Sequence, residues 1–205
     1  MDQLRITAHL SGPLVTGGGY LTFDALLASA TYSLTQDIEQ AHNQLPLKQV
    51  AGLYHASAAV YEPVAIGALA IVQAMRPDDL WLDHQWLKKN KRGDVHTKFD
   101  NLSDNILTTY KTIAVPTMTW YCEGDADRIR VLLAHLPLIG KKRVCSVTQW
   151  TVEAGELDGL HGYADEPLRP VPVELWDGDK SSPIVDAAWR PAYWDATGRT
   201  ACFVN

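Results

Sequence analysis

The stretch Leu-Arg-Ile-Thr-Ala-His-Leu, residues 4–10, alternates apolar and polar side chains with a period of two. Because successive side chains of a strand point to opposite faces, one face of this stretch is apolar and the other is polar. The pattern predicts a half-buried β-strand. Residues 11–13, Ser-Gly-Pro, predict its end or a bulge, since proline cannot donate a hydrogen bond to a neighbouring strand.

A helix is predicted shortly after this strand. The glycines at 17–19 predict a flexible turn, and Thr22 has a side chain that favours the N-cap position of a helix. Apolar residues then recur at helical spacing, and they are Phe23, Leu26, Leu27, Ala30 and Leu34. The N-terminal part of the chain is therefore predicted to be a strand followed by an amphipathic helix.

The later part of the chain repeats this pattern. Residues 106–122 are rich in β-branched and aromatic side chains, and Pro116 predicts a bend or an edge position within them. Asp125 can cap the helix that follows, and Pro137 ends it. The apolar residues of this helix are Ile129, Leu132, Leu133 and Leu136. Residues 138–143 are predicted to form a loop, and residues 144–153 the next strand.

Between the two patterns, residues 50–60 predict a strand with many small side chains, and about 67–105 predict a long insertion. The order is β-α-β, an insertion, and then β-α-β. It predicts an α+β fold over residues 1–153, with a ferredoxin-like antiparallel sheet and two helices on one face.

Residues 154–205 depart from the pattern. They contain five of the eleven prolines of the chain and three of its seven tryptophans, Trp176, Trp189 and Trp194. This composition predicts an ordered C-terminal arm that packs on the same domain, and not a separate domain.

The charge of the chain is unevenly distributed. The chain has 205 residues and a formal net charge of −6, of which residues 154–205 supply −5 through nine acids and four bases. Residues 84–150 hold eleven bases and six acids, a net charge of +5. Basic patches are the footprint of a polyanionic partner when their residues share a face. The acidic average therefore does not exclude nucleic acid.

Other classes of protein are disfavoured. Hydrophobic residues make up 46% of the chain, which predicts a globular protein, and the longest apolar stretch, near 64–72, is too short to span a membrane. Cys122, Cys145 and Cys202 are scattered and predict free thiols in a reducing compartment. The histidines match no metal motif. We therefore expect a cytoplasmic protein with no membrane segment, metal or cofactor.

Two clusters of bases are candidate contacts for an anionic ligand. The first lies in the insertion and comprises Lys88, Lys89, Lys91, Arg92 and Lys98. The second, called the basic loop below, comprises Gly140, Lys141, Lys142 and Arg143. Glycine allows a close approach of the backbone, arginine binds phosphate through two donors, and lysine acts as a point charge. The alternative is that both clusters are solvated surface charges.

A second set of candidates is Tyr54, His55, Tyr110 and Lys111. Tyr54 and His55 could contact a base of RNA. His55, Tyr110 and Lys111 could instead supply a base, an acid and a cation for cleavage of RNA by its own 2′-hydroxyl, without a metal. The alternative for each residue is an ordinary structural role in a strand.

Several of these motifs together resemble the RAMP superfamily of CRISPR proteins. The basic loop, which follows a leucine-rich helix, resembles the glycine-associated basic loop of that superfamily. Residues 4–10, 53–57 and 189–194 resemble one branch, the small subunit of type IV effector complexes that caps the 5′ handle of the guide RNA. The resemblance covers most of the chain.

The resemblance implies an RRM-like, ferredoxin-like domain whose insertion is a thumb that contacts the backbone subunit or the guide. The basic loop would hold the 5′ handle of the crRNA. The implied partners are the guide RNA, a repeated backbone subunit and a large subunit, with target DNA bound indirectly through the guide. No catalytic residue is expected, because in type IV systems another subunit usually processes the guide.

Two other functions stay open at this point. The first is a metal-independent endoribonuclease that makes the guide with His55, Tyr110 and Lys111. The second is a scaffold that binds no RNA, whose basic clusters meet acidic surfaces of protein partners.

Overall fold

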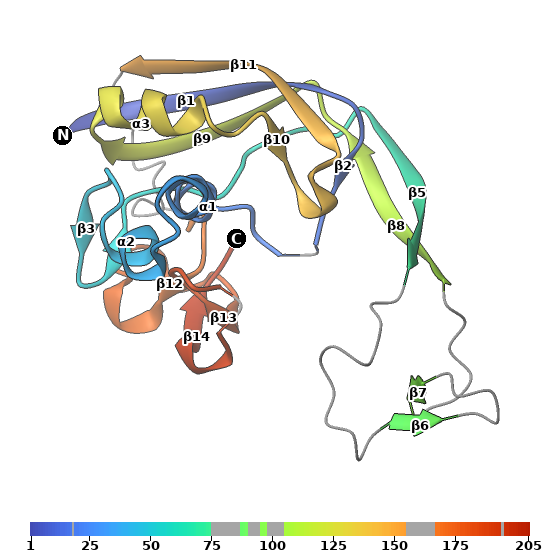
Figure 1. Cartoon of the computed structure of the whole chain (residues 1–205). Helices are drawn as coiled ribbons and strands as arrows, with labels where there is room; N and C mark the ends of the chain where they lie inside the picture. The colour runs from blue at the N-terminus through green and yellow to red at the C-terminus, as the bar shows by residue number, and fades with distance from the viewer. Residues whose placement is uncertain (18, 75–86, 90–94, 98–104, 155–166, 194) are drawn as a thin grey trace. The chain divides into compact units, whose positions relative to one another are not determined.

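A computed structural model describes residues 1–17, 19–74, 87–89, 95–97, 105–154, 167–193 and 195–205 (Figure 1). The chain forms two units, of which the first comprises Met1–Ile66 with Ile113–Asn205, and the second Gly67–Thr112. The paired strands of the first unit's main sheet run antiparallel, and helices lie between them in the chain. The fold is therefore α+β, as the sequence predicts.

The main sheet contains four strands in the order β10-β11-β1-β9. The bounds of these strands are Asp2–Ser11 for β1, Thr117–Gly124 for β9, Leu138–Ile139 for β10 and Cys145–Ala154 for β11. Strand β1 lies between β9 and β11 and pairs with both of them over most of its length. The strand predicted over residues 4–10 is thus confirmed as a central strand of the sheet.

One face of this sheet forms the core of the first unit. Leu4, Ile6 and Ala8 of β1 are fully buried, whereas the residues between them are partly exposed or exposed. Helices α1 (Phe23–Thr35) and α3 (Ala126–Leu133) supply apolar side chains to the same core. These side chains include Phe23, Leu26, Leu27, Ile129 and Leu133. The apolar side chains of the alternating strand and those at helical spacing therefore pack in one hydrophobic cluster.

Trp120 of β9 is the largest fully buried side chain of this core. Its ring centroid lies 6.1 Å from that of Phe23 and 5.8 Å from that of Trp150. The indole Nε1 donates a hydrogen bond of 2.9 Å to the carbonyl oxygen of Leu21, so its polar group is satisfied where water cannot reach it.

The two predicted helices begin where the sequence predicts, but α3 ends at Leu133 and so does not reach the predicted stop at Pro137. The Asp125 carboxylate caps α3 and accepts hydrogen bonds from the backbone N–H groups of Asp127 and Arg128. Thr22 occupies the N-cap position of α1 but makes no side-chain cap bond. A short helix that no sequence pattern predicted, α2 (Ile38–Asn43), follows α1 and is capped by Asp37.

The prediction of one regular strand over residues 50–60 is wrong. Residues 49–54 make a short hairpin of β3 (Gln49–Val50) and β4 (Leu53–Tyr54), turned by Ala51 and Gly52 at positive φ. Beyond it, single bridges join Ala56 to Cys122 and Val60 to Thr119 of β9. The turn breaks a regular ladder, so this segment follows the free edge of β9 only as an irregular strand.

The second unit contains parts of two long strands and a hairpin. Strands β5 (Ala65–Ala74) and β8 (Asn105–Ala114) are hydrogen-bonded neighbours, and β6 (Leu87–Lys89) pairs antiparallel with β7 (Val95–Thr97). Pro116 separates β8 from β9, as the sequence predicts. Strand β2 (Leu14–Val15) belongs to the first unit.

The C-terminal residues form a small antiparallel sheet of their own within the first unit. It contains β12 (Val171–Pro172), β14 (Arg199–Phe203) and β13 (Ile184–Ala188), in that order. Val171, Trp176 and Phe203 bury their side chains in a second cluster together with Leu53 of β4. This cluster joins the arm to the hairpin beside the main sheet.

A buried ion pair is a further connection between the arm and the domain. Arg169 and Asp24 are both fully buried, and Arg169 Nη2 lies 3.0 Å from Asp24 Oδ2. The guanidinium also donates to the carbonyl oxygens of Tyr54 and Ala56, at 3.1 and 2.9 Å. Tyr193 from the arm donates its hydroxyl proton to Asp24 at 2.7 Å. One side chain therefore links α1, the segment after β4 and the C-terminal arm.

Replacing Arg169 by leucine should lower the free energy of unfolding by about 3–5 kcal/mol, because the Asp24 carboxylate would stay buried without its counter-charge. Urea unfolding followed by circular dichroism measures the effect. Arg199→Leu is the matched control, since its pair with Asp186 is 43% and 69% exposed, and it should change stability by less than about 1 kcal/mol. Equal losses in the two variants would contradict the role of Arg169.

Candidate nucleic-acid interface

The basic loop connects two paired strands of the main sheet. Strand β10 ends before Gly140, Lys141–Arg143 form a tight turn that is not helical at Lys142, and β11 begins at Cys145. The backbone N–H of Arg143 donates to the carbonyl oxygen of Gly140 at 3.1 Å and closes the turn. The loop predicted over 138–143 is therefore a tight turn preceded by a short edge strand.

A side chain at Gly140 would be strained in this turn. Its φ is +79°, and a Cβ atom there would lie 2.4 Å from Leu14 Cδ1 and 3.1 Å from the Val15 carbonyl oxygen. Lys142 and Arg143 also have positive φ, at 70° and 49°. Left-handed backbone is costly for residues with a Cβ atom, so contacts elsewhere hold the turn in this form. The contact of Gly140 with β2 is one of them.

The three cations of the turn are exposed and diverge. Lys141 borders a groove on one side of the turn. Arg143 extends to the other side, where its Nη2 atom lies 3.4 Å from the Ser29 hydroxyl of α1. The turn therefore spreads positive charge over the surface between α1 and the groove, as a ligand with several phosphates requires.

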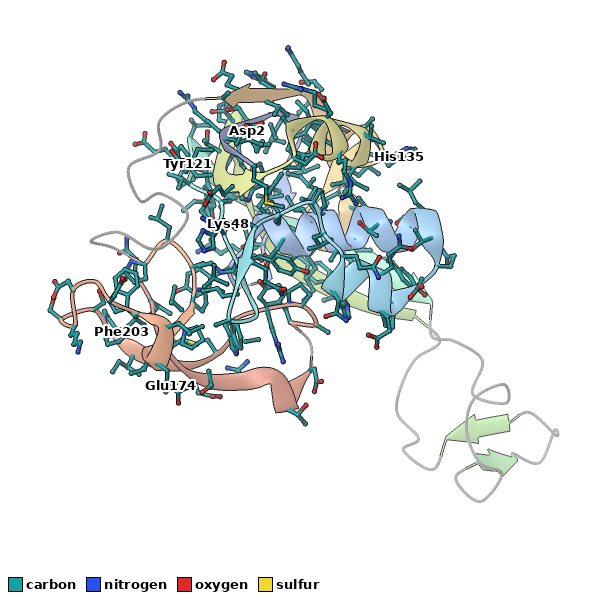
Figure 2. All side chains as sticks on the ribbon, turned by 90° about the vertical axis from the view of Figure 1, so that its left-hand side faces the viewer. Asp2, Lys48, Tyr121, His135, Glu174 and Phe203 are labelled. Atoms are coloured by element: carbon teal, nitrogen blue, oxygen red, sulfur yellow. The ribbon has the colours of Figure 1, made fainter. Side chains whose placement is uncertain are left out.

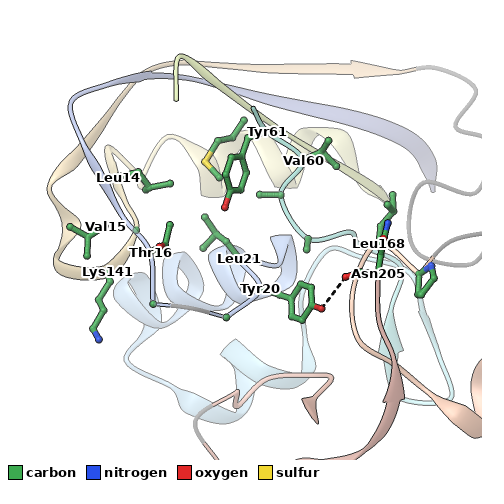
Figure 3. A pocket seen from close by; sticks show the side chains of 17 residues that line it. Leu14, Val15, Thr16, Tyr20, Leu21, Val60, Tyr61, Lys141, Leu168 and Asn205 are labelled. Atoms are coloured by element: carbon green, nitrogen blue, oxygen red, sulfur yellow. Dashed lines mark hydrogen bonds between the residues drawn. The ribbon is translucent and has the colours of Figure 1, made fainter. Parts of the chain in front are cut away.

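The groove beside the basic loop has a volume of about 870 Å³ (Figure 3). Its lining comes from residues 14–17, 19–21, 58–61, 140–141 and 167–168, with Met118 and Asn205. All of these residues belong to the first unit. Sequence reasoning missed this groove, because its walls come from segments that are far apart in the sequence and no motif connects them.

The other predicted cluster of bases lies in the second unit. Lys88 and Lys89 are residues of β6, whereas Lys91, Arg92 and Lys98 lie outside the described residues. Among the described residues of the first unit, the predicted candidate interface is therefore the basic loop.

Tyr54 does not suit the predicted contact with a base. Its side chain is 2% exposed, and its hydroxyl donates a hydrogen bond of 2.8 Å to the carbonyl oxygen of His42. The ring belongs to the main hydrophobic core, where a base cannot stack on it. The apolar environment of the hairpin decides this position, and the sequence pattern did not indicate it.

His55 lies in an ion-pair cluster at the edge of β9. Its Nδ1 atom lies 3.1 Å from Oε2 of Glu123, and Lys48 Nζ lies 3.0 Å from the same carboxylate oxygen. The backbone also joins these segments, since the Lys48 N–H donates to the Glu123 carbonyl oxygen at 2.7 Å. Figure 2 labels Lys48 in the segment that approaches this edge. The cluster fastens residues 48–55 to the sheet.

Burial is the largest influence on the pKa of His55. Burial lowers the pKa of this imidazole, and the hydrogen bond to Glu123 offsets the effect only in part. Partial burial raises the pKa of Glu123, but the bonds from Lys48 and His55 outweigh it and hold that pKa below its ordinary value. Nε2 of His55 is buried as well. In this conformation the imidazole presents neither nitrogen to a ligand.

The three residues of the predicted ribonuclease site belong to different units. His55 is in the first unit, and Tyr110 and Lys111 are in the second, on β8. The structure therefore does not define a site composed of all three.

Further findings concern metals, thiols and membranes. The described parts of the chain contain no group of three or more histidine, cysteine, aspartate or glutamate side chains that could hold a metal ion. Cys122, Cys145 and Cys202 are free, as predicted, and the structure also buries all three, which raises the pKa of each thiol. In the same parts of the chain, every helix is too short or too polar to cross a membrane.

Comparison of the chain with models of known protein families and with curated proteins finds no match.

Gly140→Ala should lower the free energy of unfolding by about 2–4 kcal/mol, because the new methyl group overlaps Leu14 and the backbone has positive φ. Thermal and urea unfolding measure the loss. Gly198→Ala is the control, since a Cβ atom at that position would have no atom within 4 Å and no positive φ constrains it, so its effect should stay within about 0.5 kcal/mol. An unchanged stability of Gly140→Ala would show that the turn has another conformation.

Acid should destabilise the protein in two stages. Since the pKa of His55 is lowered in the folded state, the unfolded chain takes up a proton first, and stability should begin to fall as the pH drops through about 6.5. The lowered pKa of Glu123 adds a second loss below about pH 4.5. Urea unfolding as a function of pH measures both stages.

His55→Gln isolates the first stage. This variant should lose the decline that begins near pH 6.5 and keep the decline at lower pH. If the variant and the wild-type protein show the same slope between pH 6.5 and 5, another group is responsible.

Proposed function

We propose that this protein is a non-catalytic RNA-binding subunit of a type IV CRISPR effector complex, which caps the 5′ handle of the guide RNA with its basic loop. Its partners would be the crRNA, a repeated backbone subunit and a large subunit, and it would support binding of target DNA through the guide. The proposal rests on the motif resemblance together with the position and form of the basic loop.

The arrangement of the main sheet supports a ferredoxin-like, RRM-like domain. In chain order, the core strands are β1, the irregular segment 56–60, β9 and β11, with α1 after the first and α3 after the third. In the sheet, β11 lies beside β1, β1 beside β9, and β9 beside segment 56–60. The spatial order is therefore fourth, first, third, second, which is the order of a ferredoxin-like β-α-β-β-α-β unit.

The observation that carries the proposal is the place of the basic loop in this order. It follows the second core helix and immediately precedes the last core strand, where the resemblance places the loop that holds the RNA. Its glycine is needed for close packing on β2, and its three cations are exposed. Exposed lysine and arginine side chains on a tight turn suit contacts to successive phosphates.

The state of His55 favours binding over catalysis. A general base must reach the proton that it removes, within hydrogen-bond distance or through one water molecule. Nδ1 of His55 is engaged by Glu123, and Nε2 is buried, so the side chain serves the attachment of residues 48–55 to β9. This is why the non-catalytic function is preferred to the endoribonuclease.

Changing Lys141, Lys142 and Arg143 together to alanine should remove most of the RNA that copurifies with the complex. With purified protein and single-stranded RNA, the slope of log Kd against log salt concentration should fall by about 2, because each lost phosphate contact contributes about 0.7. Fluorescence anisotropy between about 50 and 300 mM salt measures this slope.

Arg128, Arg130 and Lys180 changed together to alanine are the matched control, because they remove the same charge from exposed positions outside the basic loop. This control should keep the RNA and nearly the full slope. Unchanged RNA content in the basic-loop variant would overturn the proposal. Cleavage of a repeat RNA in EDTA that is lost in His55→Ala would establish the endoribonuclease instead.

A further inference from the structure

The groove beside the basic loop is apolar along its floor. Leu14 and Met118 line it and are each 1% exposed, and Leu21, Val60 and Leu168 add further apolar surface. These apolar side chains favour contact with an uncharged part of a ligand, because burying a charge without partners is costly. The ligand part that fits the floor is flat or bulky and largely uncharged.

Two tyrosine rings stand at this groove although they are far apart in the sequence. Tyr20 and Tyr61 are 45% and 37% exposed, so each ring offers part of its surface to a ligand (Figure 3). The Tyr20 hydroxyl lies 3.4 Å from the Asn205 carbonyl oxygen, which restrains the ring. Partly exposed and restrained aromatic rings are the usual stacking platforms for unpaired bases.

The glycines near Tyr20 are not required by the fold. A Cβ atom on Gly19 would have no atom within 4 Å, and one on Gly17 would meet only the Lys141 side chain, at 3.9 Å. Neither glycine has a positive φ. Packing and backbone conformation therefore leave room for side chains at both positions, and glycine keeps this rim of the groove open.

The charge around the groove favours an anionic ligand. Lys141 is the cation among the described lining residues, and none of these residues is an aspartate or a glutamate. Lys141 lies at the end of the groove formed by Leu14 and Val15, next to Lys142 and Arg143. A ligand that enters the groove from this end would place its negative charge at the basic loop and its uncharged part on the apolar floor.

From this combination we propose that the groove takes one unpaired base of the bound RNA, which contacts the rings of Tyr20 and Tyr61 while its phosphates lie at the basic loop. A nucleotide has the required division into a flat apolar part and an anionic part. The volume of about 870 Å³ lies within the range of pockets that enclose small ligands. An apolar peptide would use the floor but not the cations. This inference rests on the proposed function.

The test compares RNA with and without bases. The ligands are a 12-nucleotide adenosine RNA and a 12-unit abasic RNA of the same length and charge, with anisotropy as the readout. Tyr20→Ala combined with Tyr61→Ala should weaken binding of the adenosine RNA by about tenfold or more, because stacking on an aromatic ring is a large part of base binding. The same variant should bind the abasic RNA as tightly as the wild-type protein does.

Three controls complete the experiment. Tyr32→Ala removes a tyrosine on α1 that is similarly exposed, at 44%, but does not line the groove, and it should bind both RNAs normally. Tyr20→Phe with Tyr61→Phe keeps the rings and should bind the adenosine RNA within about twofold of the wild-type protein. Circular dichroism of each variant establishes that it is folded.

The outcomes separate this inference from the proposed function. If the double alanine variant loses equal affinity for both RNAs, or loses none, the groove does not hold a base, while RNA binding by the basic loop still stands. If the wild-type protein binds neither RNA and the complex contains none, both proposals are wrong.

Discussion

The fully buried guanidinium of Arg169 connects parts of the chain that no single strand or helix connects. It pairs with Asp24 on α1, bonds the carbonyl oxygens of Tyr54 and Ala56, and reaches the arm at Trp189 and Tyr193. A buried charge is stabilised when it is paired and hydrogen-bonded, so the five partners of the two Nη atoms favour one arrangement of these segments. The C-terminal residues are thereby made part of the first unit.

This arrangement also determines the wall of the groove. Residues 58–61 follow the segment that Arg169 holds, and Leu168 precedes Arg169 directly; both line the groove. The Ala58 N–H donates to the Leu168 carbonyl oxygen at 3.0 Å, which fixes the two walls against each other. A buried ion pair without any role in ligand contact therefore shapes the surface beside the basic loop.

Much of the fold could be predicted from local patterns. The alternation at residues 4–10 and the leucine spacing after Asp125 depend on neighbours a few residues apart, and each produced the expected element, although α3 ends at Leu133, before the predicted stop at Pro137. The prediction of one strand near 50–60 was wrong because Ala51 and Gly52 turn the chain with positive φ. The buried residues 53–58 also show no alternation of buried and exposed positions. The burial of Tyr54 follows from the same turn.

The sequence by itself determined the α+β class, the three long strands β1, β9 and β11, the helices α1 and α3, and the cations of the basic loop, because periodicity and residue type express these directly. Only the tertiary structure decided that Gly140 must pack on Leu14, that His55 is held by Glu123, and that Tyr20 and Tyr61 line one groove. Such contacts join residues separated by tens of positions. They arise when whole segments pair and become buried, and local sequence patterns do not predict such pairing.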